Sequence, residues 1–320
     1  MSQSFAEPGA GALYRAVGCA GPEASRSRPV TGIDGGEKGT QMASDETSAQ
    51  IGGAAVGAGR PAFDTSVASQ ARMYDYLLGG KDNYAVDRAA VEEALKVWPE
   101  MAFTAKANRA FLGRAVCYLA GEAGIRQFLD IGTGIPTAGN THEVAQSIAP
   151  ESRVVYVDYD PIVLAHARAL LASGDAGATE FIDADLRDTP AVLAEAGRLL
   201  DFSQPVAVTL LAILNALPDS DDPHGIVAKL MRAVPSGSYL AITHLGLDLL
   251  GEQAEDSLGT MQHRMMRKQF TSRTREQVAS FFQGLEMVEP GLVRVEEWRL
   301  EPGTSDIGKS ALWCAVGRKP

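Results

Sequence analysis

Strand-like and helical segments alternate along the chain between residues 127 and 243, and this alternation limits the possible folds more than any other feature. The predicted strands are Gln127–Ile131, Arg153–Val157, Thr179–Ile182, Pro205–Leu211 and Ser238–Thr243. Helical patterns separate them at residues 141–148, 161–172, 190–200 and 223–233. Such alternation is typical of βαβ units. The sequence therefore predicts an α/β fold with a doubly wound, mostly parallel sheet.

Two further strand candidates lie near the end of the chain, at Glu286–Val295 and Ala311–Gly317. They follow a helical pattern near Arg275–Phe282. The loop between them leaves no room for a crossover helix, so we expect them to pair antiparallel. Together with the five parallel strands they make a predicted seven-stranded sheet.

Composition separates the first 60 or so residues from the rest. They are rich in Gly, Ala, Ser and Thr, poor in aromatic residues and without sustained periodicity. Such a segment cannot bury enough apolar surface to offset its ordering entropy. We therefore expect residues 1–60 to be a disordered extension, residues 61–125 a helical region and residues 126–320 the core. Helices are predicted up to Gly79-Gly80, from about Asp87 to before Pro99, and over about Ala107–Ala123.

Charge and hydropathy exclude several classes of protein. The net charge of -11 opposes a general affinity for nucleic acid. No apolar run reaches the roughly 18 residues that a membrane helix needs, and the N-terminus does not resemble a secretion signal, so we expect a cytoplasmic protein. The cysteines form no Cys-x-x-Cys pair, and no metal site is predicted. The oligomeric state is not indicated by any pattern.

Acidic residues and glycines follow the first three predicted strands. The first strand runs into Asp130-Ile131-Gly132-Thr133-Gly134, where two glycines let the backbone approach a ligand closely. Asp158 ends the second strand, 24 residues after Gly134, where a carboxylate can accept hydrogen bonds from both hydroxyls of a ribose. Asp185 follows the third strand. Doubly wound sheets bind ligands at the carboxyl ends of their parallel strands. The residues at these three strand ends therefore predict a nucleotide site.

Two nucleotide cofactors use such a crevice, and they place different demands on it. A dinucleotide carries a pyrophosphate, which favours a third glycine and disfavours extra carboxylates. Here Pro136-Thr137 occupies the place of that glycine. S-adenosylmethionine has no phosphate but carries a sulfonium, an ammonium, a ribose diol and an adenine amine. Acidic groups at successive strand ends suit it, so the pattern favours S-adenosylmethionine as the cofactor.

Longer stretches carry a resemblance to a known family. They are ARMYDYLLGGKDNYAVDR, NRAFLGRAV, FLDIGTGIPTAGNTHEVAQ, VVYVDYDPIVLAHARALL, DADLRD, PSGSYLAITH and EPGLVRVEEWR, and they span most of residues 63–320. The chain resembles the S-adenosylmethionine-dependent methyltransferases of the seven-stranded class, and within them an actinobacterial family catalogued as DUF574. The resemblance implies a Rossmann-like core and methyl transfer to an acceptor that we expect to be a small molecule.

The resemblance also implies positions that contact the cofactor. Gly132 and Gly134 would lie beneath its methionine part. Asp158 would bind the ribose, and Asp185 with the backbone of Leu186 would bind the adenine. The full set of candidate cofactor-binding residues is Arg72, Asn83, Asp130, Gly132, Thr133, Gly134, Asp158, Tyr159, Asp185 and Leu186.

A lid is implied as well, formed by residues 72–88. Polar and aromatic side chains crowd around Gly79-Gly80 in this segment, to a density that a plain packing helix would not need. The glycines supply a hinge, and closure over the crevice would exclude water from the sulfonium. We therefore interpret the segment as a lid that orders on cofactor binding and shapes the acceptor pocket.

The sequence offers little for proton transfer. Where the resemblance leads us to expect a histidine near the end of the fourth strand, the chain has Asn215. His244, just after the fifth strand, is the remaining candidate for a general base.

Each candidate also has a structural interpretation. The glycines could only turn the chain, Asp130 could bond its own loop, and Asp158 could cap a helix. Arg72 and Asn83 could belong to a salt-linked surface. Two other functions stay open, a non-catalytic sensor of S-adenosylmethionine and a nicotinamide-dependent oxidoreductase, the second disfavoured by the lack of a Tyr-x-x-x-Lys pair.

Overall fold

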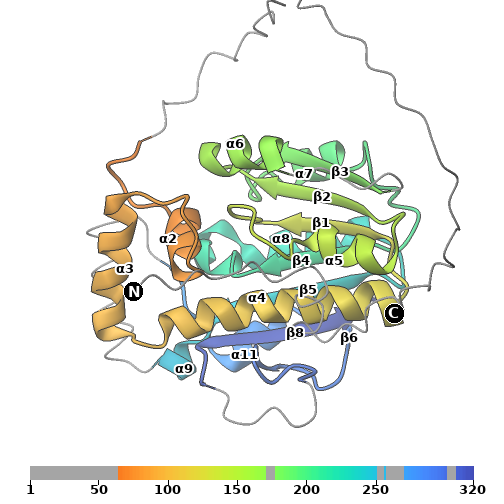
Figure 1. Ribbon diagram of the computed structural model, residues 1–320. Helices are drawn as coiled ribbons and strands as arrows, with labels where there is room; N and C mark the ends of the chain where they lie inside the picture. Colours follow the sequence, from red (N-terminus) through yellow and green to blue (C-terminus); the bar gives the residue numbers. More distant parts are fainter. Residues whose placement is uncertain (1–63, 171–176, 251–255, 257–269, 301–307) are drawn as a thin grey trace, which may run out of the picture.

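The computed structural model describes residues 64–170, 177–250, 256, 270–300 and 308–320. The predicted extension over residues 1–60 lies outside the described residues. Figure 1 shows one central sheet with helices packed on both of its faces. The first two described helices, α2 and α3, lie beside the carboxyl ends of the strands.

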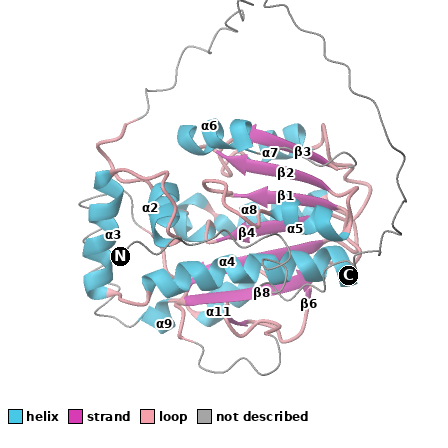
Figure 2. Ribbon diagram, in the orientation of Figure 1, coloured by secondary structure: helices cyan, strands magenta, loops and turns pink. Residues whose placement is uncertain are grey.

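The sheet has the predicted doubly wound order, β3-β2-β1-β4-β5-β8-β6, with β7 also paired to β8. The first five strands are parallel to one another, and β8 is antiparallel to β5 (Figure 2). The strands are β1 Gln127–Ile131, β2 Arg153–Asp158, β3 Ala178–Asp183, β4 Ala207–Leu211, β5 Tyr239–Leu245, β6 Glu286–Met287, β7 Val293–Arg294 and β8 Leu312–Arg318. The predicted fold class is confirmed.

The strand predicted over residues 286–295 is wrong in one respect, because the structure divides it into β6 and β7. Both pieces pair with β8, so the described sheet has eight strands rather than seven. Between them Pro290 has no backbone N–H to give to a ladder, and Gly291 has a φ of 83°. The chain therefore turns at these two residues instead of continuing straight.

The helices cover the sheet in the order that alternation predicts. The third predicted helix begins earlier than expected, at Met101, because Pro99 ends only the preceding helix. The helical elements are α2 Gln70–Leu77, α3 Ala85–Val97, α4 Met101–Cys117, η1 Tyr118–Glu122, α5 Thr141–Ile148, α6 Pro161–Leu170, α7 Thr189–Ala196, η2 Leu214–Ala216, η3 Asp219–Asp221, α8 Pro223–Ala233, α9 Leu247–Leu250 and α11 Arg275–Ser280.

Two apolar cores lie on opposite faces of the sheet. Leu129 and Ile131 of β1 face one core with α7, α8 and α11, and Phe128 faces the other with α4 and α5. Successive side chains of a strand point to opposite faces, so a central strand covered on both sides exposes neither set of side chains. This explains why β1 is buried along its whole length.

The helical region before the core is tied together by buried polar groups. The carboxylate of Asp87 contacts Arg72 Nε at 2.7 Å and accepts the backbone N–H groups of Ser69 and Tyr84. Arg72 and Asp87 are almost fully buried. The salt-linked surface suggested by the sequence is therefore an internal network that joins α2 to α3.

We expect Asp87→Ala to destabilise this region by about 3 to 5 kcal/mol, because the buried Arg72 guanidinium would lose its carboxylate. Urea unfolding, followed by circular dichroism and by hydrogen exchange in α2 and α3, measures the loss. Lys96→Ala is the matched control, since it breaks an exposed ion pair with Glu93 in the same helix and should cost less than about 1 kcal/mol. Equal losses in the two variants would contradict a stabilising role for the buried pair.

Candidate active site

The carboxyl ends of β1, β2 and β4 form the edge where a doubly wound sheet binds ligands. The strand order reverses at β1, which lies between β2 and β4. The loop after β1 contains Gly132 and Gly134, with φ angles of 78° and 66°. Side chains other than glycine rarely adopt such angles. The pattern of two glycines therefore corresponds to a real backbone requirement at the switch point.

The two glycines differ in their surroundings. A Cβ atom at Gly132 would lie 2.6 Å from the side chain of Ile213, which follows β4. A Cβ atom at Gly134 would meet no heavy atom within 4 Å. Gly132 thus lets the loop pass close to the end of β4, and Gly134 borders open space where a ligand can approach the backbone.

Arg109 of α4 braces this loop from behind. Its guanidinium donates to the carbonyl oxygens of Thr137 and Ala138 and, at 2.9 Å, to Oδ1 of Asn140. The carboxylate of Glu143 accepts the backbone N–H of Asn140 at the start of α5. Arg109 was not among the residues predicted for the site, although it lies in the motif NRAFLGRAV that carried the resemblance.

Asp130 holds the end of β1 to its neighbours. One carboxylate oxygen accepts the hydroxyl of Thr209 in β4 at 2.7 Å, and the other accepts the hydroxyl of Thr141 in α5 at 2.6 Å. Burial raises the pKa of Asp130, and the two hydroxyl donors act in the opposite direction. These two hydrogen bonds are the contacts that a structural role of Asp130 requires.

Asp158 stands at the end of β2 and faces the glycine loop. Its Oδ2 accepts the N–H of Gly134 at 2.9 Å, and its Oδ1 accepts the N–H groups of Tyr159 and Asp160. Burial raises the pKa of Asp158, although the backbone donors partly offset this effect. The residue thus acts as a local cap, and it also brings a carboxylate to the position predicted for a ribose contact.

The end of β3 is more exposed. Asp185 has 39% of its side chain accessible and forms an ion pair with Arg187 at 2.8 Å. Leu186 is buried in the core next to it, and Tyr159 is exposed beside the end of β2. Thr133 Oγ1 donates to the carbonyl of Asp130. The structure therefore brings Gly132, Thr133, Gly134, Asp158 and Tyr159 together, with Asp185 and Leu186 at the adjacent strand end.

Helix α2 lies across this edge of the sheet. Ser69, just before the helix, donates to the Asp160 carboxylate at 2.8 Å, and Gln70 Nε2 donates to the carbonyl of Ala212 at 3.2 Å. Asp160 follows β2 and Ala212 follows β4, so two consecutive residues bridge the end of β1. Ala71 packs against a small apolar cluster that contains Ile135 of the glycine loop.

The structure places Arg72 and Asn83 inside the helical region rather than at the strand ends. Arg72 is paired with Asp87, as described above. Asn83 donates to the carboxylate of Asp75 at 2.8 Å and accepts from Arg88. A Cβ atom at Gly80 would collide with that same Asp75 carboxylate. Both polar groups thus have partners within the α2–α3 region, and their direct contact with the cofactor stays a prediction.

His244 does not have the environment of a general base. Its side chain is fully buried at the end of β5. Nδ1–H donates to the carbonyl of Leu245 at 2.9 Å, and Nε2 accepts from the Arg273 guanidinium at 2.7 Å. Burial and, to a smaller extent, the Arg273 guanidinium lower its pKa to about 4, although the hydrogen bond to Leu245 acts in the opposite direction. This geometry contradicts the expected role, since both ring nitrogens are engaged within the protein.

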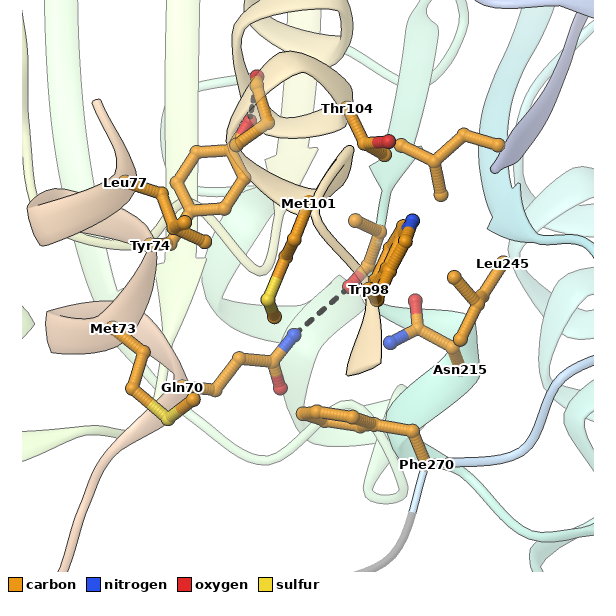
Figure 3. Close-up of a pocket in the computed structure, with 13 residues that line it drawn as sticks. Gln70, Met73, Tyr74, Leu77, Trp98, Met101, Thr104, Asn215, Leu245 and Phe270 are labelled. Carbon is orange, nitrogen blue, oxygen red and sulfur yellow. Dashed lines mark hydrogen bonds between the residues drawn. The ribbon is translucent and has the colours of Figure 1, made fainter. Parts of the chain in front are cut away.

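Beside the crevice lies a cavity that the sequence did not predict. It has a volume of about 100 Å³ and is lined by α2, the start of α4 and the ends of β4 and β5 (Figure 3). Asn215, which stands where a histidine was expected, lines it. Ala212, also in its wall, has a φ of 53°, a strained angle for a residue with a side chain.

Within the described parts of the chain, no three His, Cys, Asp or Glu side chains gather as metal ligands would. None of the helices in those parts combines the length and apolar character needed to cross a bilayer.

The environment of His244 predicts how stability depends on pH. In the unfolded chain a histidine binds a proton near pH 6.5, but in the folded protein His244 does so only near pH 4. Between these values the unfolded state binds more protons, so stability is lost as the pH falls from about 6.5 to about 4. The contribution is about 3 kcal/mol. Urea unfolding across this range should show a shallower pH slope for His244→Gln than for the wild type, and identical slopes would refute the assignment.

Known proteins resemble this chain over most of its length. A family model described as S-adenosyl methyltransferase matches residues 57–320. A crystal structure of a DUF574 family protein from Streptomyces avermitilis is 45% identical, with a TM-score of 0.77, over 80% of this chain and 99% of that one. A structure from Thermobifida fusca is 41% identical, with a TM-score of 0.72, over 80% and 96% of the two chains. No curated protein matches. The chain belongs to the S-adenosyl methyltransferase family, whose cofactor is S-adenosylmethionine.

Proposed function

We propose that this protein transfers the methyl group of S-adenosylmethionine to a small-molecule acceptor. The observation that carries the proposal is the hydrogen bond between Asp158 and the backbone of Gly134, which borders open space at the switch point of the sheet. The chain belongs to a family that uses this cofactor. Bound S-adenosylmethionine supplies a methyl group that its sulfonium has already activated.

The residues at the strand ends suit the parts of the cofactor. Asp158 would accept hydrogen bonds from the ribose hydroxyls, and the backbone at Gly132 and Gly134 would leave room for the methionine part. Asp185 and the backbone of Leu186 would meet the adenine. Tyr159 and Thr133 would flank the ribose and the methionine part. Because Asp158 is already bonded to Gly134, ribose binding there would also hold the glycine loop.

Catalysis would depend on positioning and on exclusion of water rather than on a base. Among the described residues that line the cavity beside the crevice, none is a histidine, an acid or a basic residue. Binding groups that hold the reacting atoms in position can lower the activation free energy by several kcal/mol. A closed, apolar site also keeps water from competing with the acceptor.

A non-catalytic sensor would bind the same cofactor without transfer. The apolar cavity next to the crevice favours the enzyme, because a sensor has no need of a second site for an acceptor. Release of S-adenosylhomocysteine during turnover distinguishes the two functions.

The ribose contact can be tested by calorimetry with S-adenosylhomocysteine. Asp158→Ala should weaken binding by about 2 to 4 kcal/mol, because charge-assisted hydrogen bonds to the hydroxyls are lost. Glu195→Ala, which removes an exposed carboxylate on α7, is the control and should bind like the wild type. The wild type should not bind NAD. Binding of NAD without binding of S-adenosylhomocysteine would overturn the proposed function, and unchanged affinity in a folded Asp158→Ala would leave this residue only a cap.

We also propose that α2 and the following turn form a lid over the bound cofactor. The contacts of Ser69 with Asp160 and of Gln70 with Ala212 support this, since they fasten the start of α2 to both sides of the crevice. Arg72 and Asn83 would act indirectly, by keeping the shape of the lid.

Hydrogen exchange tests the lid. Addition of S-adenosylhomocysteine should raise protection across residues 72–88 in addition to the three strand ends. In Ser69→Ala the rise over residues 72–88 should be smaller, because one fastening to the crevice is missing. Ser66→Ala, an exposed serine three residues earlier, is the control. Protection confined to the strand ends would show that the segment is fixed scaffold.

A further inference from the structure

The cavity beside the crevice has an almost entirely apolar wall. Its apolar lining comes from α2, from the start of α4 and from the ends of strands and loops (Figure 3). The residues are Met73, Leu77, Trp98, Met101, Leu245 and Phe270. No residue with a charged side chain lies among the described residues that form this wall. Transfer of a charged group into such a space costs several kcal/mol unless a partner compensates for it. The cavity is therefore suited to a neutral ligand.

Two carboxamides interrupt the apolar wall. Asn215 is only 6% exposed, and its Oδ1 has no hydrogen-bond partner among the described residues. The Nε2 of Gln70 donates a hydrogen bond to the carbonyl of Ala212. A buried acceptor without a partner is costly, so a donor group is missing at Asn215. A ligand hydroxyl or amino group would supply it.

The protein holds Asn215 in place from the rear. Its carbonyl accepts the N–H of Thr271 at 2.7 Å. The buried Arg273 donates to the carbonyls of Leu214 and Leu217 on either side of it. Because the turn is fixed at three points, the Asn215 carboxamide is a preorganised binding group.

The cavity and the cofactor crevice are neighbours. Ala212 lines the cavity, and the next residue, Ile213, fills the space against which Gly132 packs. The two sites are thus separated by consecutive residues after β4. A molecule in the cavity lies next to the loop that is proposed to hold the methionine part of the cofactor.

We propose that this cavity is the acceptor pocket and that it takes a neutral aromatic compound of about one ring, bonded to Asn215 through a hydroxyl or amino group. The inference rests on the proposed function. Apolar cavities of about 150 Å³ hold a benzene-sized molecule, so a partly open cavity of about 100 Å³ leaves room for no more than one ring. On methylation the acceptor oxygen or nitrogen uses its lone pair to bond the methyl carbon. The carbon–sulfur electron pair stays on sulfur, and the proton of the acceptor leaves to water.

Fluorine NMR can measure the ligand class without any cofactor. We expect 4-fluorophenol and fluorobenzene to bind the wild type, and 4-fluorobenzoate to bind at least tenfold more weakly. The preference for 4-fluorophenol over fluorobenzene should fall about 3- to 10-fold in Asn215→Leu, because one hydrogen bond is lost at similar volume. Retained binding of fluorobenzene shows that this variant is folded. An unchanged preference, or tight binding of the benzoate, would overturn the proposal.

A second variant tests the location. Ala105→Leu adds volume at the cavity wall and should weaken both neutral ligands at least tenfold, whereas Lys106→Leu, exposed on the same helix, should not. The assignment as acceptor pocket requires transfer of labelled methyl to at least one of a panel of one-ring phenols and anilines. No transfer by a protein that binds S-adenosylhomocysteine would overturn that assignment. Failure of S-adenosylhomocysteine to bind would instead overturn the proposed function, while Asn215-dependent binding of 4-fluorophenol would still establish the ligand class of the cavity.

Discussion

The position of β1 between β2 and β4 is the constraint on which the rest of the molecule depends. Since all three strands are parallel, their carboxyl ends meet at one edge, and the connections that follow them must share that edge. Asp130 fastens this arrangement through hydroxyls from β4 and α5. Gly132 then lets the loop after β1 pass against Ile213 after β4. A bulkier residue at position 132 would force the two loops apart, so the site begins with a packing requirement in the sheet.

Strands of the core could be predicted from the sequence because each is a short apolar run with its own flanking helix. Burial on both faces makes such a run largely apolar, as at Phe128, Leu129 and Ile131 of β1, and the alternation with helices does not depend on distant residues. The strand over residues 286–295 was divided in the structure, because Pro290 and Gly291 interrupt it and β8 can pair with both pieces. That outcome depends on a partner some twenty residues away, which periodicity does not report.

Some residues of the candidate site, like the strands, have a local signal in the sequence, and others do not. Gly134 and Asp158 could be found because the spacing between two strand ends is a local property of a βαβ unit, and the structure joins them by a hydrogen bond. For Arg72 and Asn83 the sequence shows polar density but not the direction of the side chains. Their partners, Asp87 and Asp75, lie in the same short segment, so the polar groups satisfy one another inside it. Gln70, which does reach the crevice, carries no signal that distinguishes it from any other glutamine.

Two kinds of environment meet at Ala212 and Ile213, and methyl transfer gives a reason for the division. A cationic cofactor is best held by carboxylates and backbone dipoles, which the ends of β1, β2 and β3 provide. The attacking atom reacts best when it is poorly hydrated, which an apolar wall provides. If both demands fell on one surface, the carboxylates would draw water to the acceptor. Placing them on opposite sides of the end of β4 satisfies both. The uncharged Asn215 then fits its place, because it can orient an acceptor without bringing a charge, and its hydration, into the dry half of the site.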